Sequence, residues 1–366
     1  MKFSCSKNIL SSSINITQKA VTGKTTMPIL QGILLKADND NVTLIASDND
    51  LSIETNISCP VEENGSIVVD AKLLGEIVRR FPNDTINIST TDNSSIEIIC
   101  QKSKFTLICM NAEDFPNIPQ INENAIFKIP QKTLKSMIRG TIFSTAQDET
   151  RPILTGILFE IKNKKLNMVA LDGYRLALMS EGINDEGSIN AVIPGKTLNE
   201  ISKILEDNNQ NVNITFTPNH ILFNIGKTKM ISRLLEGEFI KYSSIIPEEY
   251  NLKVTVKRDE ISECIERASL MGKEGNSSLI KFDIQENEII ITSNSQLGMV
   301  KEEVNIIMQG QPLQIAFNSK YFLDILKIIE EEEIVMEFSS SVSPCIIKNK
   351  EKGNCIYLVL PVRLLT

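Results

Sequence analysis

Tryptophan is absent from this chain of 366 residues, tyrosine occurs five times and histidine only once. The single histidine, His220, follows Pro218 and Asn219 in a turn signal, so it is a poor candidate for a Ser-His-Asp or Cys-His nucleophile. A Cys-x-x-Cys motif is also missing, and no histidine–cysteine cluster has the spacing of a zinc site. We therefore expect no catalytic residues, no bound metal and no cofactor.

Long apolar runs are missing as well. The longest, such as residues 357–362, fall far short of the ~20 residues that a membrane-spanning helix needs. The opening residues 1–5 run into polar Ser6-Lys7-Asn8, without the apolar segment of a signal peptide. Seven scattered cysteines, an odd number, then indicate reduced and mostly buried thiols in a cytoplasmic protein with no membrane partner.

The composition that is present is that of a globular protein, with 42% apolar and 23% charged residues. The net charge of −8 argues against a chain that is basic all over, but it leaves room for a basic patch on one face. At roughly 100–200 residues per domain, the length predicts two or three domains.

The chain repeats itself. Residues 28–34 (PILQGIL) recur as residues 152–158 (PILTGIL), with six identities in seven at an offset of 124. The same offset relates five more identical pairs: Phe3 and Phe127, Leu10 and Leu134, Ala46 and Ala170, Asp48 and Asp172, and Phe115 and Phe239.

A third copy is fainter. The segments 72–79, 196–203 and 320–327 each carry a base, an acid four residues later, isoleucine at the next position and a base two residues after that. We predict three homologous domains at residues 1–122, 123–248 and 249–366. In each domain the pattern of one strand, one helix and then several strands occurs twice. This pattern predicts an α+β fold with antiparallel sheets and two helices per domain.

Two short motifs suggest chemistry that their surroundings do not support. Residues 23–25 (GKT) resemble the end of a phosphate-binding loop, but Gln18 stands where that motif needs glycine, and Pro28 with a strand pattern follows instead of a helix. Residues 48–50 (DND) resemble a metal loop, but the repeat counterpart is Asp172-Gly173-Tyr174, so we interpret both as structural turns.

The second helix of each domain has two faces. In the first copy Leu73, Leu74, Ile77, Val78 and Phe81 form one apolar stripe, which we expect to pack on a sheet. The bases of the triplicated segment lie on the other side and stay in solvent. A single exposed lysine is usually only solvated, and an acid four residues away is ordinary helix support. The repetition of base, acid and base in phase favours a shared function.

Four segments are more specific than the repeat: residues 151–156 (RPILTG), 171–177 (LDGYRLA), 235–239 (LEGEF) and the closing 357–364 (YLVLPVRL). Together with the threefold repeat, they resemble the bacterial sliding clamp family, the β subunits of DNA polymerase III. The resemblance covers the full length. It implies a homodimeric, head-to-tail ring of six similar domains, with sheets outside and helices around duplex DNA. It also implies a non-catalytic DNA polymerase III subunit, a processivity factor for DNA replication that slides without sequence specificity and tethers the polymerase.

Sliding requires attraction to phosphates without base readout, so that every register along the DNA costs about the same. By position the resemblance implies DNA contacts at Lys24, Lys196, Asn318 and Tyr321. The repeat adds Lys72, Arg79, Lys203, Lys320 and Lys327. We expect the interleaved acids Glu76, Glu200 and Asp324 to temper the grip. Lys24 stands where many members carry arginine, so a phosphate contact is kept but a bidentate fork is lost.

The resemblance also implies a groove between the second and third domains. It binds short linear peptides of the replicative polymerase, the clamp loader, other polymerases and repair proteins. Its implied walls are Leu154, Thr155, Leu171, Gly173, Tyr174, Arg175, Leu176, Ile240, Ile245, Val342, Leu358, Leu360, Pro361, Val362 and Arg363. Apolar walls would take leucine and phenylalanine anchors, and Arg175 would fix the orientation of the peptide. Ile240 replaces a frequent proline, Ser244 stands where arginine can occur, and Leu365-Thr366 extend past the usual end.

The implied dimer contact joins domain one of one chain to domain three of the other. Its candidates are Leu73, Ile77, Phe105 and Leu107 against Leu270 and Met271, with Lys102 and Lys104 facing acids near Glu302 and Glu303. Leu73 and Ile77 also belong to the apolar stripe, so an internal packing role is a strong alternative.

Two other classes of function stay open at this point. One is a three-domain protein-interaction scaffold that never encircles DNA, and retention on circular but not linear DNA separates it from a clamp. The other is an enzyme acting on nucleic acid, for which the chain offers no nucleophile or metal set.

Overall fold

A computed structural model describes residues 1–23, 25–91, 94–122, 127–148, 150–183, 187–272, 278–296, 298–350 and 353–363. Lys24, one of the predicted DNA contacts, lies outside the described residues. Within them, no helix has both the length and the apolar content that crossing a membrane requires.

The first third of the chain has two α-helices and nine strands among its described residues. They are β1 (Lys2–Ser6), α1 (Lys7–Thr17), β2 (Gly32–Asp38), β3 (Asn41–Ser47), β4 (Leu51–Ser58), β5 (Val61–Glu63), β6 (Gly65–Asp70), α2 (Ala71–Arg80), β7 (Thr85–Thr90), β8 (Ser95–Cys100) and β9 (Ser103–Ile108). Three short 3-10 helices join them: η1 (Gln18–Ala20), η2 (Pro28–Gln31) and η3 (Ala112–Asp114).

The middle third repeats this order. It contains β10 (Phe127–Pro130), α3 (Gln131–Ile142), η4 (Pro152–Thr155), β11 (Gly156–Lys162), β12 (Lys165–Leu171), β13 (Arg175–Gly182), β14 (Ile189–Pro194), α4 (Gly195–Ser202), β15 (Asn211–Phe216), β16 (His220–Ile225), β17 (Thr228–Arg233) and η5 (Tyr242–Ser244).

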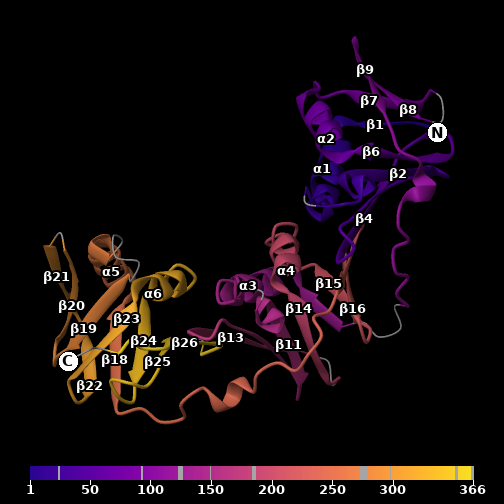
Figure 1. Cartoon of the computed structure of the whole chain (residues 1–366). Helices are drawn as coiled ribbons and strands as arrows, with labels where there is room; N and C mark the ends of the chain where they lie inside the picture. The colour runs from indigo at the N-terminus through magenta and orange to yellow at the C-terminus, as the bar shows by residue number, and fades with distance from the viewer. Residues whose placement is uncertain are drawn as a thin grey trace. The chain divides into compact units, whose positions relative to one another are not determined.

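The last third contains β18 (Leu252–Lys257), α5 (Arg258–Gly272), β19 (Leu279–Ile284), β20 (Glu288–Ser295), β21 (Gly298–Asn305), β22 (Ile307–Gly310), β23 (Leu313–Asn318), α6 (Ser319–Leu326), β24 (Glu333–Phe338), β25 (Cys345–Asn349) and β26 (Cys355–Val359). Figure 1 follows these elements from the indigo N-terminal third to the yellow C-terminal third. All the strand pairs between them are antiparallel, so the predicted α+β class is confirmed.

The repeat is visible in the helix boundaries. The second helices α2, α4 and α6 begin at Ala71, Gly195 and Ser319, each 124 residues after the last. Side chains cap α2 and α6: the carboxylate of Asp70 accepts from the Leu73 amide at 2.7 Å, and the Asn318 side chain accepts from the Lys320 amide at 3.0 Å.

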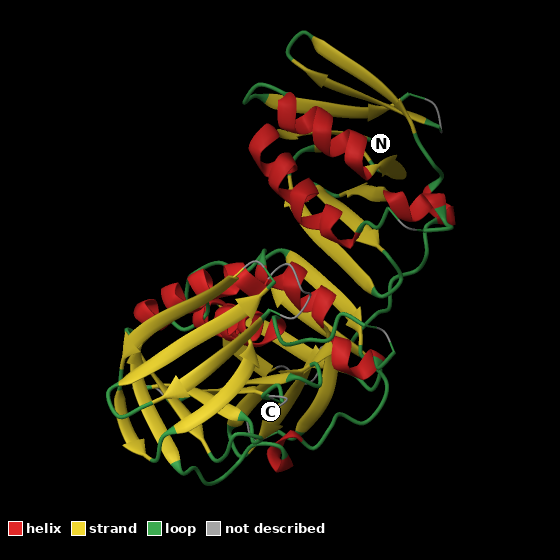
Figure 2. Cartoon of the chain, turned by 60° about the vertical axis from the view of Figure 1, so that its left-hand side comes forward, coloured by secondary structure: helices red, strands yellow, loops and turns green. Residues whose placement is uncertain are grey.

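The described residues form two compact units, one of residues 1–133 with 200–234, and one of residues 134–199 with 235–366. The first unit holds a five-stranded sheet, β5-β1-β7-β8-β9, and an eight-stranded sheet, β10-β15-β16-β17-β4-β3-β2-β6. The second holds a nine-stranded sheet, β14-β11-β12-β13-β26-β25-β24-β18-β22, and a four-stranded sheet, β21-β20-β19-β23. Helices cover the sheets (Figure 2), with α1 against β3 and β4, and α5 against β19, β20 and β21.

Two strand pairs carry a sheet from one third of the chain into the next. Strand β4 pairs with β17, and β13 pairs with β26, each in antiparallel register. These ladders explain why the compact units cut through the middle third, since half of its strands continue a sheet of the first third and half continue a sheet of the last.

The apolar stripe of α2 is narrower than predicted. Leu74, Ile77 and Val78 are buried and Phe81 is 7% exposed, but Leu73 is 46% exposed, so the prediction that Leu73 packs on the sheet is wrong. Neighbouring positions on a helix point about 100° apart, and the sheet covers the side of α2 that holds Leu74 rather than Leu73.

The seven cysteines are free thiols, and six of them are buried. Burial raises the pKa of the Cys5 thiol to about 12 and that of Cys109 to about 11. Because the thiolate is the reactive form, these side chains act as small apolar residues at neutral pH, as the sequence predicted.

Candidate functional site

A tight turn connects β12 to β13. One carboxylate oxygen of Asp172 accepts from the Tyr174 amide at 2.9 Å and from the Arg175 amide at 3.0 Å, while Gly173 has a positive φ of 92°. The first third repeats this turn, with Asp48 accepting from the amides of residues 50 and 51 at 3.2 and 2.8 Å and a positive φ at residue 49. Both aspartates therefore cap turns, and the described residues contain no group of acidic, histidine or cysteine side chains arranged for a metal.

The turn forms one wall of a small cavity of about 60 Å³. Its lining residues are Leu171, Gly173, Tyr174, Arg175, Leu176, Ile245, Leu358 and Leu360, all of them predicted groove residues. Leu154 belongs to the same buried cluster as Leu171, Leu176 and Leu358. The sequence thus named a set of side chains that the fold brings together from the middle third, the linker and the last strand.

The other predicted groove residues lie outside this cavity. Thr155 lines a different and larger one, of about 700 Å³, together with Lys196. Ile240, Val342 and Val362 are exposed by 39%, 69% and 41%, an unusual exposure for large apolar side chains. Pro361 is half-buried and Arg363 is exposed.

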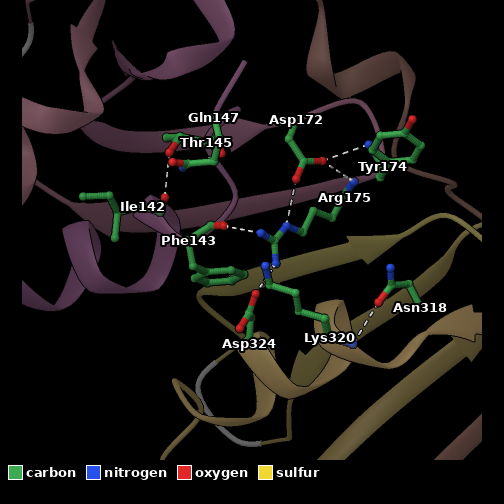
Figure 3. Close-up of polar contacts among 10 residues, drawn as sticks. All are labelled: Ile142, Phe143, Thr145, Gln147, Asp172, Tyr174, Arg175, Asn318, Lys320 and Asp324. Carbon is green, nitrogen blue, oxygen red and sulfur yellow. Dashed lines mark hydrogen bonds and ion pairs between the residues drawn. The ribbon is translucent and has the colours of Figure 1, made fainter. Parts of the chain in front are cut away.

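Arg175 is almost fully buried, with 9% of it exposed. Its guanidinium donates to Asp172 at 3.0 Å, to Asp324 of α6 at 2.6 Å and to the carbonyl of Phe143 at 2.5 Å. Figure 3 shows the guanidinium between these three oxygens. Its donors are therefore directed at the protein itself, and it positions the turn that carries Tyr174.

Aromatic rings surround the same guanidinium. It lies 4.7 Å from the ring centre of Tyr321 and 5.4 Å from that of Phe143. Tyr174, which is 61% exposed, stacks on Tyr321 with ring centres 6.2 Å apart. Burial, followed by the carboxylate of Asp172, raises the pKa of the Tyr321 hydroxyl, which stays protonated and able to donate. A predicted groove residue and a predicted DNA contact are thus direct neighbours.

The triplicated helix segments have one arrangement in all three thirds. The bases are exposed in every copy, and the acids are half-buried. The six bases are Lys72, Arg79, Lys196, Lys203, Lys320 and Lys327. Each acid has a cation: Glu76 pairs with Arg80 at 3.1 Å, Glu200 with Lys203 at 2.6 Å and with Lys19 at 3.6 Å, and Asp324 with Arg175 at 2.6 Å. These ion pairs partly neutralise the acids, so the acids repel an anion near the bases less strongly than unpaired carboxylates would. Asn318 is half-buried and caps α6.

The predicted dimer residues lie on two edge strands and the helices beside them. Strand β9 is at the edge of the five-stranded sheet, with Phe105 41% exposed and Ile108 89% exposed. Strand β21 is at the edge of the four-stranded sheet, with Met299 74% exposed. Leu270 is 58% exposed, Met271 is half-buried, and Leu107 and Ile77 are buried.

The charged members of that set have partners within the chain. Lys104 pairs with Glu97 at 2.7 Å, Glu302 with Arg267 at 2.7 Å and Glu303 with Lys301 at 2.6 Å, while Lys102 is exposed. Hydrogen bonds from Arg267 hold the pKa of the Glu302 carboxyl below its usual value.

The sequence interpretation missed a polar cluster that holds the linker before the last third. The hydroxyl of Tyr242 donates to Glu160 at 2.5 Å, and the Asn167 amide donates to both. The linker also contributes Ile245 to the cavity, so the cluster fixes part of the groove wall. The signal in the sequence was one polar residue inside each of two mostly apolar strands, Glu160 in β11 and Asn167 in β12.

Comparison with known proteins assigns all three thirds to one family. Models of the DNA polymerase III beta subunit match its N-terminal domain to residues 1–119, its central domain to residues 128–241 and its C-terminal domain to residues 243–363. The beta sliding clamp of Bacillus subtilis is 37% identical across 99% of this chain and all of that protein.

Solved structures agree. A crystal structure of a putative DNA polymerase III beta subunit from Eubacterium rectale is 39% identical, with a TM-score of 0.96 over the full length of both chains. The DNA polymerase sliding clamp of Bacillus subtilis is 36% identical, with a TM-score of 0.97, again over both full lengths.

The three clamp domains and these matches define the class as a DNA sliding clamp, a ring-forming and non-catalytic processivity factor of DNA replication. The chain belongs to the family of DNA polymerase III beta subunits, the beta sliding clamps. Proteins of this family form dimers, encircle duplex DNA and bind polymerase and other proteins. Membership of this family favours the clamp over the protein-interaction scaffold, the alternative that the sequence had left open.

Proposed function

We propose that this clamp holds DNA through the exposed bases of its three second helices. The observation that carries the proposal is the repeated arrangement of exposed bases and half-buried, ion-paired acids in α2, α4 and α6. Lys24, Asn318 and Tyr321 complete the proposed set. Lysine side chains attract any phosphate without reading bases, so they suit a contact that slides.

The test is retention on DNA of two shapes. The clamp is loaded onto nicked circular duplex, and the same DNA is then cut once to make it linear. A ring that encircles DNA stays on the circle through a salt wash and leaves the linear form from its ends. Equal retention on both forms would overturn the proposal, because it would mean binding from one side.

The cavity under Tyr174 is proposed as the docking site for partner peptides of the replicative polymerase, the clamp loader, other polymerases and repair proteins. Support comes from its apolar lining and from the exposed apolar residues of the predicted groove, Ile240, Val342, Leu360 and Val362. Exposed apolar side chains of this kind mark interaction sites, and leucine or phenylalanine anchors would bury them. A Leu176→Ser variant should lose peptide binding, whereas Leu178→Ser, on the same strand and buried but not lining the cavity, should keep it.

We propose that the ring closes by pairing β9 of one protomer with β21 of its partner. The support is the repeat: β4 joins β17, β13 joins β26, and the corresponding strands left at sheet edges are β9 and β21. Strands β9 and β17 have six residues each, and β4 and β21 have eight. A head-to-tail contact of this kind is heterologous and closes when the rotation fits.

The register of β4 with β17 predicts the register of the dimer contact. Met230 is the third residue of β17 and pairs with Ile53, the third of β4. The third residues of β9 and β21 are Phe105 and Val300, so we expect them to face each other across the interface. Cysteines at both positions should cross-link the ring, while cysteines at Phe105 and Glu302, two residues out of register, should not.

The proposed domain boundaries stay at residues 1–122, 123–248 and 249–366, and the proposed compartment is the cytoplasm. The mostly buried, reduced cysteines suit a reducing compartment. Limited proteolysis tests the boundaries, because cleavage should concentrate in the two linkers near residues 122 and 248.

A further inference from the structure

The proposed groove and the proposed DNA-facing helix α6 share one cluster of side chains. Tyr174 lines the cavity and stacks on Tyr321 of α6, with the rings inclined by 21°. Arg175 joins the same two elements, because its guanidinium donates one hydrogen bond to Asp172 in the turn and another to Asp324 of α6. The close-up in Figure 3 shows this bridge between the turn and the helix.

The corresponding turn of the first third carries different side chains. There the positions of Tyr174 and Arg175 are occupied by Asp50 and Leu51, which have neither ring nor guanidinium, and Thr197 of α4 takes the place of Tyr321. The acid of α4, Glu200, pairs instead with Lys203 at 2.6 Å and with Lys19 at 3.6 Å. The connection of ring and guanidinium therefore belongs to the turn that forms the groove.

The cavity under Tyr174 has a volume of about 60 Å³, far below the roughly 300–1,000 Å³ of ligand pockets. A peptide anchor that enters it therefore has to widen it. Leu171, Leu176 and Leu358 are packed into the core, whereas Tyr174 is 61% exposed. Tyr174 is thus the wall that can swing outward, and its movement takes one stacking partner away from Tyr321.

We propose that Arg175 is a positioning residue that couples peptide binding in the groove to DNA contact by α6. A peptide that displaces Tyr174 releases the ring of Tyr321 toward the DNA, and DNA that engages Tyr321 leaves the groove open. The ion pair of Arg175 with Asp324 makes the turn and the helix move together. Linkage requires the effect to be equal in both directions, so DNA should tighten peptide binding by the same factor as peptide tightens DNA binding.

This inference depends on the proposed function, and its test measures both activities separately. A fluorescein-labelled octapeptide with a Leu-Phe pair is titrated with the full-length clamp, with and without a 30-base-pair linear duplex at low salt. We expect the duplex to lower the peptide dissociation constant about 5-fold or more, within the usual range of coupling between sites. The coupling ratio is the peptide dissociation constant without duplex divided by that with duplex. For Asp324→Asn we expect this ratio to fall close to one. Without DNA, the dissociation constant of the peptide for this variant should stay within about 3-fold of the wild-type value.

Glu200→Gln is the matched control. It removes a negative charge from the corresponding position of α4, where the acid pairs with Lys203 and Lys19 rather than with the groove turn. We expect its ratio to equal that of the wild type, which separates coupling through Arg175 from a general gain in attraction for DNA.

Three results would overturn parts of this reasoning. A wild-type ratio of one or less, with both ligands bound, refutes the coupling and leaves the proposed function intact. An unchanged ratio in Asp324→Asn refutes the path through Arg175. Absence of peptide binding in the wild type refutes the proposed groove, and absence of duplex binding at low salt refutes the proposed phosphate contacts of the second helices; either result refutes the coupling as well.

Discussion

Replacing Phe105 by alanine should open the ring without unfolding the protomer. Phe105 is 41% exposed, on an edge strand. A whole phenylalanine buries about 200 Å², so about 80 Å² remain for a partner to cover, which is about 2 kcal/mol at about 25 cal/mol per Å². A two-protomer ring has two such interfaces, so its dissociation into monomers becomes easier by about 4 kcal/mol, or roughly a thousandfold.

The assay is molecular mass in solution during dilution, by light scattering or sedimentation. The protomer mass is 40.9 kDa, and the wild type should hold twice that mass to far lower concentrations than Phe105→Ala. Ile9→Ala is the control, because Ile9 is 49% exposed but lies on α1, which is part of neither edge strand. Phe105 also packs on Phe81 edge to face at 5.6 Å, so circular dichroism must show that the variant stays folded. Equal dissociation of Phe105→Ala and wild type would refute the strand-edge interface.

Four further outcomes are expected. Lys320→Ala should make the slope of log DNA affinity against log salt shallower by about one for each phosphate that the lysine neutralises, hence by about two per ring. Lys227→Ala, in the β16–β17 turn, should leave the slope unchanged. Tyr242→Phe should weaken peptide binding without affecting DNA retention, because it removes the hydrogen bond to Glu160 that holds the linker; equal weakening of both would contradict this role. Glu302→Gln should be less stable than wild type at pH 7 in urea unfolding, because Arg267 lowers the pKa of the Glu302 carboxyl in the folded state. The difference in stability should shrink as pH falls below about 4.3, the unfolded-state pKa of glutamate; a difference that grows on acidification would mean that the folded-state pKa is raised instead. Gly310→Ala should lower the melting temperature of the whole chain, because the new Cβ would clash with the Asn251 carbonyl oxygen; an unchanged melting temperature would mean that this strand end can shift.

Much of the fold could be predicted because its signals are local. The base and acid spacing within eight residues marked the second helices, and their observed starts at Ala71, Gly195 and Ser319 keep the predicted offset of 124. Helix periodicity and capping depend on neighbours along the chain, so one copy of the repeat supports the interpretation of the next. The α+β class followed from the same local signals.

Which face of a helix is covered was less predictable. Leu73 and Leu74 are chemically identical, yet one is 46% exposed and the other is fully buried. Their difference depends on how α2 lies against its sheet, and composition within the helix carries no information on that. The same uncertainty applied to Ile77, which is buried inside the protomer although it was also a candidate for the dimer contact.

The sequence by itself determined the threefold repeat and the position of the bases on the second helices, and its resemblance to the clamp family named the side chains that line the cavity under Tyr174. Only the tertiary structure decided what Arg175 does, because its partner Asp324 lies 149 residues further along the chain. It also decided which strands remain at sheet edges, since β4 and β13 find partners in the next third while β9 and β21 do not find one among the described residues. Pairings over such separations depend on how whole sheets join, and no local pattern of residues encodes them.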